Sequence, residues 1–229
     1  MRIPFFTQGR KDTSRLIAVG DIHGCLDSLR RLMAKIRPNA SDRLVFLGDY
    51  VDRGPDSRGV IEFLIDFKNR FPRTVFLKGN HEAMFIDFLS GKNRDLFLLN
   101  NGAATLRQYD TGGELHIPAS HWEFLSGLPL YHRCEDFIFV HAGLRPGVPL
   151  ERQQEQDLLW IRGDFLYSDY DWGGVVVFGH TPLDRVLQDG NKLGLDTGAV
   201  YGRLLTACEV RQRTFWSVRG PKPEGDKTR

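Results

Sequence analysis

Side chains that can bind metal ions recur along this sequence in five short motifs, each of which also contains glycine. The motifs occupy residues 20–24, 48–54, 79–82, 141–143 and 179–182. Glycine at such positions lets backbone and ligand approach each other closely. The side chains that offer ligand atoms are those of Asp21, His23, Asp49, Asn80, His141 and His180.

The donor atoms of this set narrow the choice of metal. Carboxylate, amide and imidazole ligands without thiolate suit Mn, Fe, Zn or Co better than a calcium site or a structural zinc site. A carboxylate such as that of Asp49 can bridge two ions about 3.5–4 Å apart, so that they bind the attacking and leaving oxygens of a phosphoryl group. We therefore predict two divalent ions, with Mn as the first candidate.

Taken singly, these residues have ordinary structural explanations. Asp21 could cap a helix, Asn80 could belong to a turn, and a histidine after a buried strand is often only hydrogen-bonded. The joint pattern favours the metal centre, because four of the seven histidines directly follow strand-like runs in company with Gly, Asp or Asn. The other three, His116, His121 and His132, have no such setting and are predicted to be structural.

Each motif follows a short aliphatic and aromatic run that is typical of a buried strand. The predicted strands are Leu16–Val19, Leu44–Leu47, Val75–Leu77, Phe137–Val140 and Val175–Phe178. In open α/β sheets, ligands bind in the crevice beyond the strand ends. The pattern therefore predicts that the motifs meet at one edge.

Amphipathic stretches alternate with these runs and predict helices between them. Apolar residues recur at helical spacing over residues 26–36, until Pro38 ends the pattern. A second helix is predicted from near Asp56 to the residue before Phe71, and a third over residues 84–89. The alternation of strands and helices indicates an α/β fold.

The composition indicates a folded protein without a dominant charge. Of 229 residues, 41% are hydrophobic and 26% are charged, which is close to globular averages. The net charge of +2 is too small for a protein that works mainly by neutralising nucleic-acid or membrane phosphates. We expect a single catalytic domain over residues 1–219 and a polar C-terminal tail over residues 220–229.

The three cysteines, Cys25, Cys134 and Cys208, are widely spaced and form no C-x-x-C pair. Neither a disulfide framework nor a thiolate zinc site is predicted. No apolar run long enough to span a membrane and no signal-peptide pattern is visible. We expect a cytoplasmic protein that binds neither nucleic acid nor membrane.

The motifs resemble those of a known family. Residues 20–24, 48–54 and 79–82 are similar to the three signature blocks of the phosphoprotein phosphatases, within the calcineurin-like metallophosphoesterases, and residues 141–143 and 179–181 resemble the two later histidine motifs. Residues 157–162 and 195–199 look most like stretches of short bacterial and phage serine/threonine phosphatases. The resemblance implies two mixed β-sheets packed as a sandwich and flanked by helices. It does not imply a regulatory subunit.

The resemblance also implies a role for each site residue. Asp21, His23 and Asp49 would hold one metal ion, and Asp49, Asn80, His141 and His180 would hold the other, with Asp49 bridging. A hydroxide bound to this dinuclear centre would attack phosphorus directly. His81 would protonate the leaving oxygen, Asp52 would orient His81, and Arg53 and Arg162 would bind the phosphate oxygens.

Three functions are open at this point. The first is a serine/threonine protein phosphatase that acts on a phosphoprotein or phosphopeptide, and the alternative is a symmetrical dinucleoside tetraphosphate hydrolase. A catalytically silent phosphoprotein-binding scaffold is the third, but it gives His81 no use. The aromatic residues between 150 and 173 could stack on a base or a phosphotyrosine ring, although packing explains them more simply.

Overall fold

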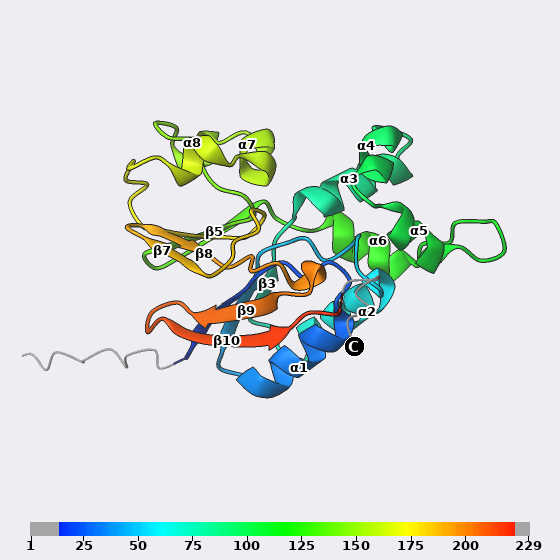
Figure 1. Cartoon of the computed structure of the whole chain (residues 1–229), viewed down its shortest axis with the longest axis horizontal. Coiled ribbons are helices and arrows are strands. Elements are labelled where there is room, and N and C mark those ends of the chain that lie inside the picture. Colours follow the sequence, from blue (N-terminus) through cyan, green and yellow to red (C-terminus); the bar gives the residue numbers. More distant parts are fainter. Residues whose placement is uncertain (1–13, 223–229) are drawn as a thin grey trace, which may run out of the picture.

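The computed structural model describes residues 14–222, and within them the chain forms two mixed β-sheets that pack face to face (Figure 1). The first sheet has the strand order β10-β9-β1-β2-β3, in which β1, β2 and β3 are parallel, β9 is antiparallel to β1, and β10 is antiparallel to β9. Its strands are β1 (Leu16–Val19), β2 (Arg43–Phe46), β3 (Thr74–Phe76), β9 (Leu204–Glu209) and β10 (Thr214–Arg219).

The second sheet has the order β4-β5-β6-β8-β7, with a parallel centre and an antiparallel strand at each edge. Its strands are β4 (Tyr131–Cys134), β5 (Phe137–Val140), β6 (Val175–Phe178), β7 (Leu187–Asp189) and β8 (Lys192–Gly194). The fold class predicted from the sequence is therefore confirmed.

Helices cover the outer faces of both sheets (Figure 1). In the described part of the chain, α1 lies against the first sheet, α7 and α8 lie over the second, and α3 to α6 gather at one end. The helices are α1 (Leu26–Ile36), α2 (Ser57–Arg70), α3 (Asn80–Leu89), α4 (Arg94–Leu99), α5 (Ala103–Tyr109), α6 (Ala119–Ser126), α7 (Glu155–Trp160) and α8 (Gly163–Leu166), with short 3-10 turns at Leu150–Arg152 and Ala199–Tyr201.

The central strands β1, β5 and β6 are apolar at every position because both of their faces are buried. In β1, Ile17 and Val19 pack against the helical layer, whereas Leu16 and Ala18 point between the two sheets. This alternation follows from the two-residue period of a strand. The inner layer is completed from the second sheet by Phe139 of β5 and other apolar residues.

The strands and helices predicted from the sequence are present, with bounds that differ by a few residues at most. β1, β5 and β6 match the predicted ranges, β2 and β3 each begin and end one residue earlier, and α3 begins at Asn80 rather than at Met84. Asp56 caps α2 by accepting a hydrogen bond from the Gly59 N–H at 2.8 Å. Of the tail expected at 220–229, residues 223–229 lie outside the described residues.

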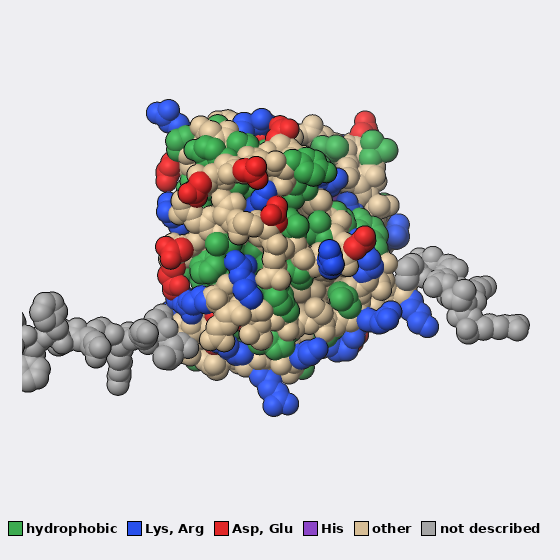
Figure 2. Space-filling model, turned by 60° about the vertical axis from the view of Figure 1, so that its left-hand side comes forward, with side chains coloured by type: hydrophobic (Ala, Val, Ile, Leu, Met, Phe, Trp, Pro, Cys, Tyr) green, Lys and Arg blue, Asp and Glu red, His purple; other side chains and the backbone are tan. Residues whose placement is uncertain are grey.

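The described surface carries charges of both signs. Figure 2 shows basic and acidic side chains interspersed on one face of the molecule, as the near balance of charges in the sequence predicts. Among residues 14–222, no helix has the length and apolar character needed to cross a membrane.

Candidate active site

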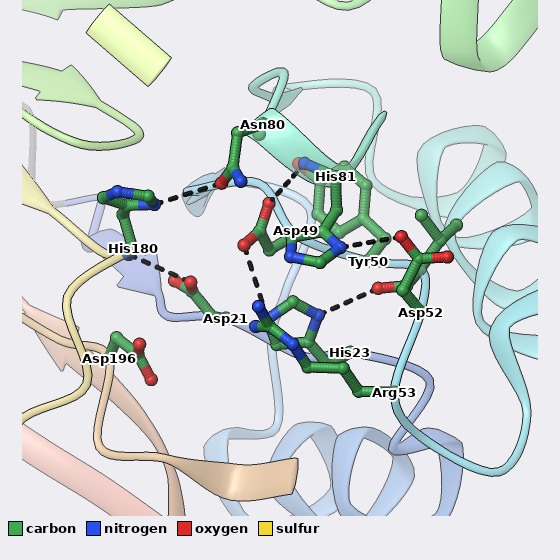
Figure 3. Close-up of polar contacts among 12 residues, drawn as sticks. Asp21, His23, Asp49, Tyr50, Asp52, Arg53, Asn80, His81, His180 and Asp196 are labelled. Atoms are coloured by element: carbon green, nitrogen blue, oxygen red, sulfur yellow. Dashed lines mark hydrogen bonds and ion pairs between the residues drawn. The ribbon is translucent and has the colours of Figure 1, made fainter. Parts of the chain in front are cut away.

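The predicted ligand residues meet at the carboxyl ends of strands from both sheets. Asp21 and His23 follow β1, Asp49 follows β2, Asn80 begins α3 after β3, His141 follows β5, and His180 follows β6. All six are at least 95% buried. Figure 3 shows Asp49 in the middle of the site, with His23 on one side and Asn80 on the other.

Two groups of side chains could each hold a metal ion, and Asp49 belongs to both. In His23, Asp49 and His81, and in Asp49, His141 and His180, one ligand atom per residue lies within 4.8 Å of the others. His23 Nε2 is 3.3 Å from Asp49 Oδ2, and His141 Nε2 is 3.3 Å from Asp49 Oδ1. The two oxygens of Asp49 therefore face different groups, so this carboxylate could serve both ions.

Asn80 lies in the second group. Its Oδ1 is 2.9 Å from His141 Nε2 and 3.0 Å from His180 Nδ1. The side-chain oxygen thus converges with two imidazole nitrogens, which is the arrangement expected of ligands to one ion.

Asp21 contributes a free carboxylate oxygen. Its Oδ2 accepts a hydrogen bond from the His180 backbone N–H at 2.9 Å, whereas Oδ1 is buried without a hydrogen-bond partner. A buried oxygen without a partner is costly. A cation would satisfy it.

The backbone at the site is strained. Five of the ten non-glycine residues with positive φ in the described chain are site residues, at φ values between 45° and 69°: His23, Asp49, Asp52, Arg53 and His180. Such conformations cost energy and persist where surrounding structure enforces them, often at functional sites. Glycine makes room nearby, because a Cβ on Gly79 would lie 2.2 Å from Asp49 Oδ1.

Glu82 holds the loop that carries Asp49. Its Oε2 accepts hydrogen bonds from the backbone N–H groups of Asp49 and Gly79, and its Oε1 accepts from those of Tyr50 and Val51, at 2.7–3.2 Å. Burial, with the charge of Asp49, raises the pKa of Glu82 to about 8, and the N–H donors oppose this. Because four donors point at the two oxygens, the geometry is that of an ionised carboxylate.

Burial favours the neutral form of the ligand imidazoles. It lowers the pKa of His23 and His141 below the usual value, and with the charge of His141 it lowers the pKa of His180 to about 3. A neutral imidazole is the form that binds metal ions.

The buried carboxylates repel one another. Burial, reinforced by the charges of Asp196 and Asp49, raises the pKa of Asp21 well above its usual range. Burial likewise raises the pKa of Asp196 to about 6, although the Gly198 N–H opposes it. Burial works against ionisation of Asp49 as well, but the surrounding histidines outweigh it and lower its pKa.

These observations fit divalent cations. The site concentrates buried carboxylates, neutral imidazoles and an amide oxygen, and it leaves Asp21 Oδ1 and His81 Nε2 without partners. Bound cations would offset the repulsion between the carboxylates and satisfy the free oxygen.

His81 and Asp52 form a buried pair beside the ligand groups. His81 Nδ1 is 2.7 Å from Asp52 Oδ2, and both residues are fully buried. The His81 backbone N–H donates to Asp49 Oδ1 at 3.1 Å, and His81 Nε2 is free. The Asp52 contact at Nδ1 leaves Nε2 to exchange a proton.

The two predicted phosphate-binding arginines contact opposite sides of the site. One guanidinium nitrogen of Arg53 lies 2.7 Å from His23 Nε2, and Arg162 Nε donates to His180 Nε2 at 3.2 Å. Arg53 is partly buried and Arg162 is exposed, so both can meet a ligand that enters from solvent.

Three residues near the site had no role in the sequence prediction: Glu82, Asp196 and Thr105. Glu82 stands within the 79–82 motif and Asp196 within the 195–199 stretch, so membership of these motifs could have indicated a role at the site. Thr105 stands in no motif, yet its hydroxyl donates to Asp52 Oδ1 at 2.6 Å. Nothing in the sequence near Thr105 indicates this contact.

Most of the aromatic residues between 150 and 173 pack on other rings, whereas Tyr167 is 88% exposed. Phe165 is fully buried and packs on Phe178 and Trp172, and Tyr170 packs on Trp172. Trp160 is different, because its ring lies 6.1 Å from that of His180. It also lines a cavity of about 410 Å³ between α3, α4 and α7.

Residues 14–206 match the family model described as calcineurin-like phosphoesterase. The chain is 31% identical over 216 residues to the serine/threonine-protein phosphatase 1 of Salmonella typhimurium, a match that covers 88% of this chain and 94% of that protein. It is 28% identical over 232 residues to the asymmetrical bis(5'-nucleosyl)-tetraphosphatase PrpE of Anoxybacillus flavithermus, over 90% of this chain and 94% of that protein. The crystal structure of a putative diadenosine tetraphosphatase superposes with a TM-score of 0.73 and 28% identity, and covers 91% of this chain and 95% of its own.

Proposed function

The chain belongs to the calcineurin-like phosphoesterase family, and we propose that it is a metal-dependent serine/threonine protein phosphatase. The observation that carries this proposal is the buried His81–Asp52 pair, whose free Nε2 adjoins two groups of metal-binding side chains. Such a pair suits the release of a strongly basic leaving group, such as the alkoxide of serine or threonine.

We assign the ligand residues to two sets that share Asp49. Asp21, His23 and Asp49 would hold one ion, and Asp49, Asn80, His141 and His180 would hold the other, with Mn²⁺ as the first candidate. The close group around His23 contains His81 rather than Asp21, and Asp21 is included because its Oδ1 is buried without a partner. When bound, divalent ions supply Lewis acidity that activates water and neutralises phosphate charge.

His81 would deliver the proton. Asp52 Oδ2 accepts a hydrogen bond from Nδ1–H and so orients the ring. The doubly protonated ring carries its second proton on Nε2, which would pass to the leaving oxygen and leave the imidazole neutral. Full burial of both side chains strengthens this contact, because no water competes for it.

Arg53 and Arg162 would bind the phosphoryl oxygens. Their guanidinium groups contact His23 and His180, which lie in different ligand groups, so that a phosphate between the groups can reach both. Planar guanidinium groups bind phosphate oxygens in bidentate fashion, and two of them match the charge of one phosphomonoester dianion.

A second function has specific support from the relatives. The PrpE proteins and the putative diadenosine tetraphosphatase match this chain about as broadly as the protein phosphatase does. Trp160, half-buried beside His180, offers a ring on which a base could stack. A dinucleoside tetraphosphate hydrolase is therefore the alternative, and the relatives favour asymmetrical over symmetrical cleavage.

Product analysis distinguishes the two. Chelator-treated protein supplied with Mn²⁺ is incubated with a phosphothreonine peptide and, separately, with diadenosine tetraphosphate. The proposal predicts inorganic phosphate from the peptide with little loss of the dinucleotide. Conversion of the dinucleotide to ATP and AMP, with the peptide intact, would replace it by the asymmetrical hydrolase, and two ADP molecules would indicate the symmetrical one.

A further inference from the structure

Thr105 is a fully buried threonine of α5 that contacts the Asp52 carboxylate at Oδ1, the oxygen that does not contact His81. Its hydroxyl donates to Asp52 Oδ1 at 2.6 Å and lies 3.1 Å from Ser57 Oγ. The same hydroxyl accepts a hydrogen bond from the Asp52 backbone N–H at 2.9 Å. One side chain, 53 residues away along the sequence, therefore contacts both the backbone and the carboxylate of Asp52.

These contacts fix the orientation of the Asp52 carboxylate. Oδ1 is bound to Thr105 and Oδ2 to His81 Nδ1, so that rotation about the carboxylate bond would break both hydrogen bonds. The backbone of Asp52 has φ of 69° and that of Arg53 has φ of 65°, and these strained conformations need external support. The hydrogen bonds from Asp52 N–H to Thr105 and Ser57 supply it.

We propose that Thr105 is a positioning residue for the proton transfer: its hydroxyl holds the Asp52 carboxylate, which holds His81 with Nε2 aimed at the leaving oxygen. The inference rests on the proposed function in that it assigns the leaving-group proton to His81. The hydroxyl itself touches neither substrate nor metal ligands. Its loss should therefore weaken proton donation and leave metal binding unchanged.

The dependence of the rate on the leaving group separates this role from a merely structural one. p-Nitrophenolate is a stable leaving group that needs little protonation, whereas phenolate is about as basic as a tyrosine side chain. A variant with a misplaced acid should be slow on phenyl phosphate and nearly normal on p-nitrophenyl phosphate. A variant with general damage to the fold or the metal site should be slow on both.

The test variant is Thr105→Val, which replaces the hydroxyl by a methyl group of similar size. We expect kcat on phenyl phosphate to fall about tenfold and kcat on p-nitrophenyl phosphate to change less than about twofold, with Thr105→Ser close to wild type on both. Thr105→Ala gives the same test if Thr105→Val does not fold. In a His81→Ala background, Thr105→Val should have no further effect, because the acid it positions is gone.

A matched control makes the same kind of change outside the site. Thr74→Val removes a buried hydroxyl that donates to the Phe71 carbonyl at 2.7 Å. This variant should leave the ratio of the two rates unchanged.

The assignment of Thr105 would be overturned if kcat of Thr105→Val fell equally on both aryl phosphates or on neither. It would also be overturned if Thr105→Val caused its full loss of kcat again in the His81→Ala background. The aryl phosphates decide this independently of the natural substrate. Failure to dephosphorylate the peptide would overturn the proposed function alone.

Discussion

A small chemical change at the buried Glu82 carboxylate should weaken the support of the site. Glu82→Gln keeps the size of the side chain and one oxygen, but replaces the other oxygen by an NH₂ group. Two of the four backbone N–H groups that Glu82 accepts would then face a donor instead of an acceptor. These N–H groups are buried, so water does not replace the lost partner.

The cost follows from the number of hydrogen bonds lost. An unsatisfied buried donor costs about 1–3 kcal/mol, so two of them destabilise the fold by roughly 2–6 kcal/mol. For a chain of this length, about 2–4 °C is lost for each kcal/mol, which gives a midpoint lower by roughly 4–24 °C. Because Asp49 and Gly79 are among the donors, the variant should also bind metal more weakly.

Thermal unfolding of metal-free and Mn²⁺-loaded protein measures both effects. Glu151→Gln, at an exposed glutamate of the turn before α7, is the matched control and should leave both midpoints unchanged. If Glu82→Gln unfolds at the wild-type temperature and gains as much from Mn²⁺, Glu82 does not support the Asp49 loop and the reasoning is wrong.

Three further changes have expected results. His81→Ala should keep the wild-type metal content, measured by elemental analysis, while turnover of the peptide falls by about 10²-fold or more, and loss of metal would instead place His81 among the ligands. A thiol reagent should label partly exposed Cys134 first, because burial raises the pKa of Cys25 and Cys208 to about 12. Mass spectrometry of briefly treated native protein measures the order of labelling, and equally fast labelling of either buried thiol would contradict the prediction. Burial lowers the pKa of His121, so as the pH falls through about 6.5 the unfolded chain takes up this proton first and the folded state loses stability. In the presence of chelator, the thermal unfolding midpoint of the wild type should therefore drop more between about pH 7 and pH 5 than the midpoint of His121→Asn. Parallel pH curves for the two proteins would refute this prediction.

The central strands could be predicted because they are buried on both faces. β1, β5 and β6 read as unbroken apolar runs, and the ligand residues follow them directly. The edge strands gave no such signal: β7 is largely exposed, and β10 is only half-buried. α4 and α8 are too short for a helical period to stand out.

Some residues of the site could be predicted from the sequence and others could not. Residues that follow strands, such as Asp49 and His141, could be placed together from the order of the motifs. Thr105 could not, because its contact with Asp52 depends on how α5 packs against α2, and no local pattern encodes that packing. Side chains that support a site from a distant helix become visible only once the tertiary structure is known.

The most direct test of the account is phosphate release from a phosphothreonine peptide as Mn²⁺ is added to chelator-treated protein, for the wild type and for Asp49→Asn. The account predicts that wild-type activity rises from near zero and saturates as about two ions bind per chain, whereas Asp49→Asn loses both the bound metal and the activity. Peptide dephosphorylation that needs no metal, or an Asp49→Asn variant that keeps two ions and full turnover, would contradict it.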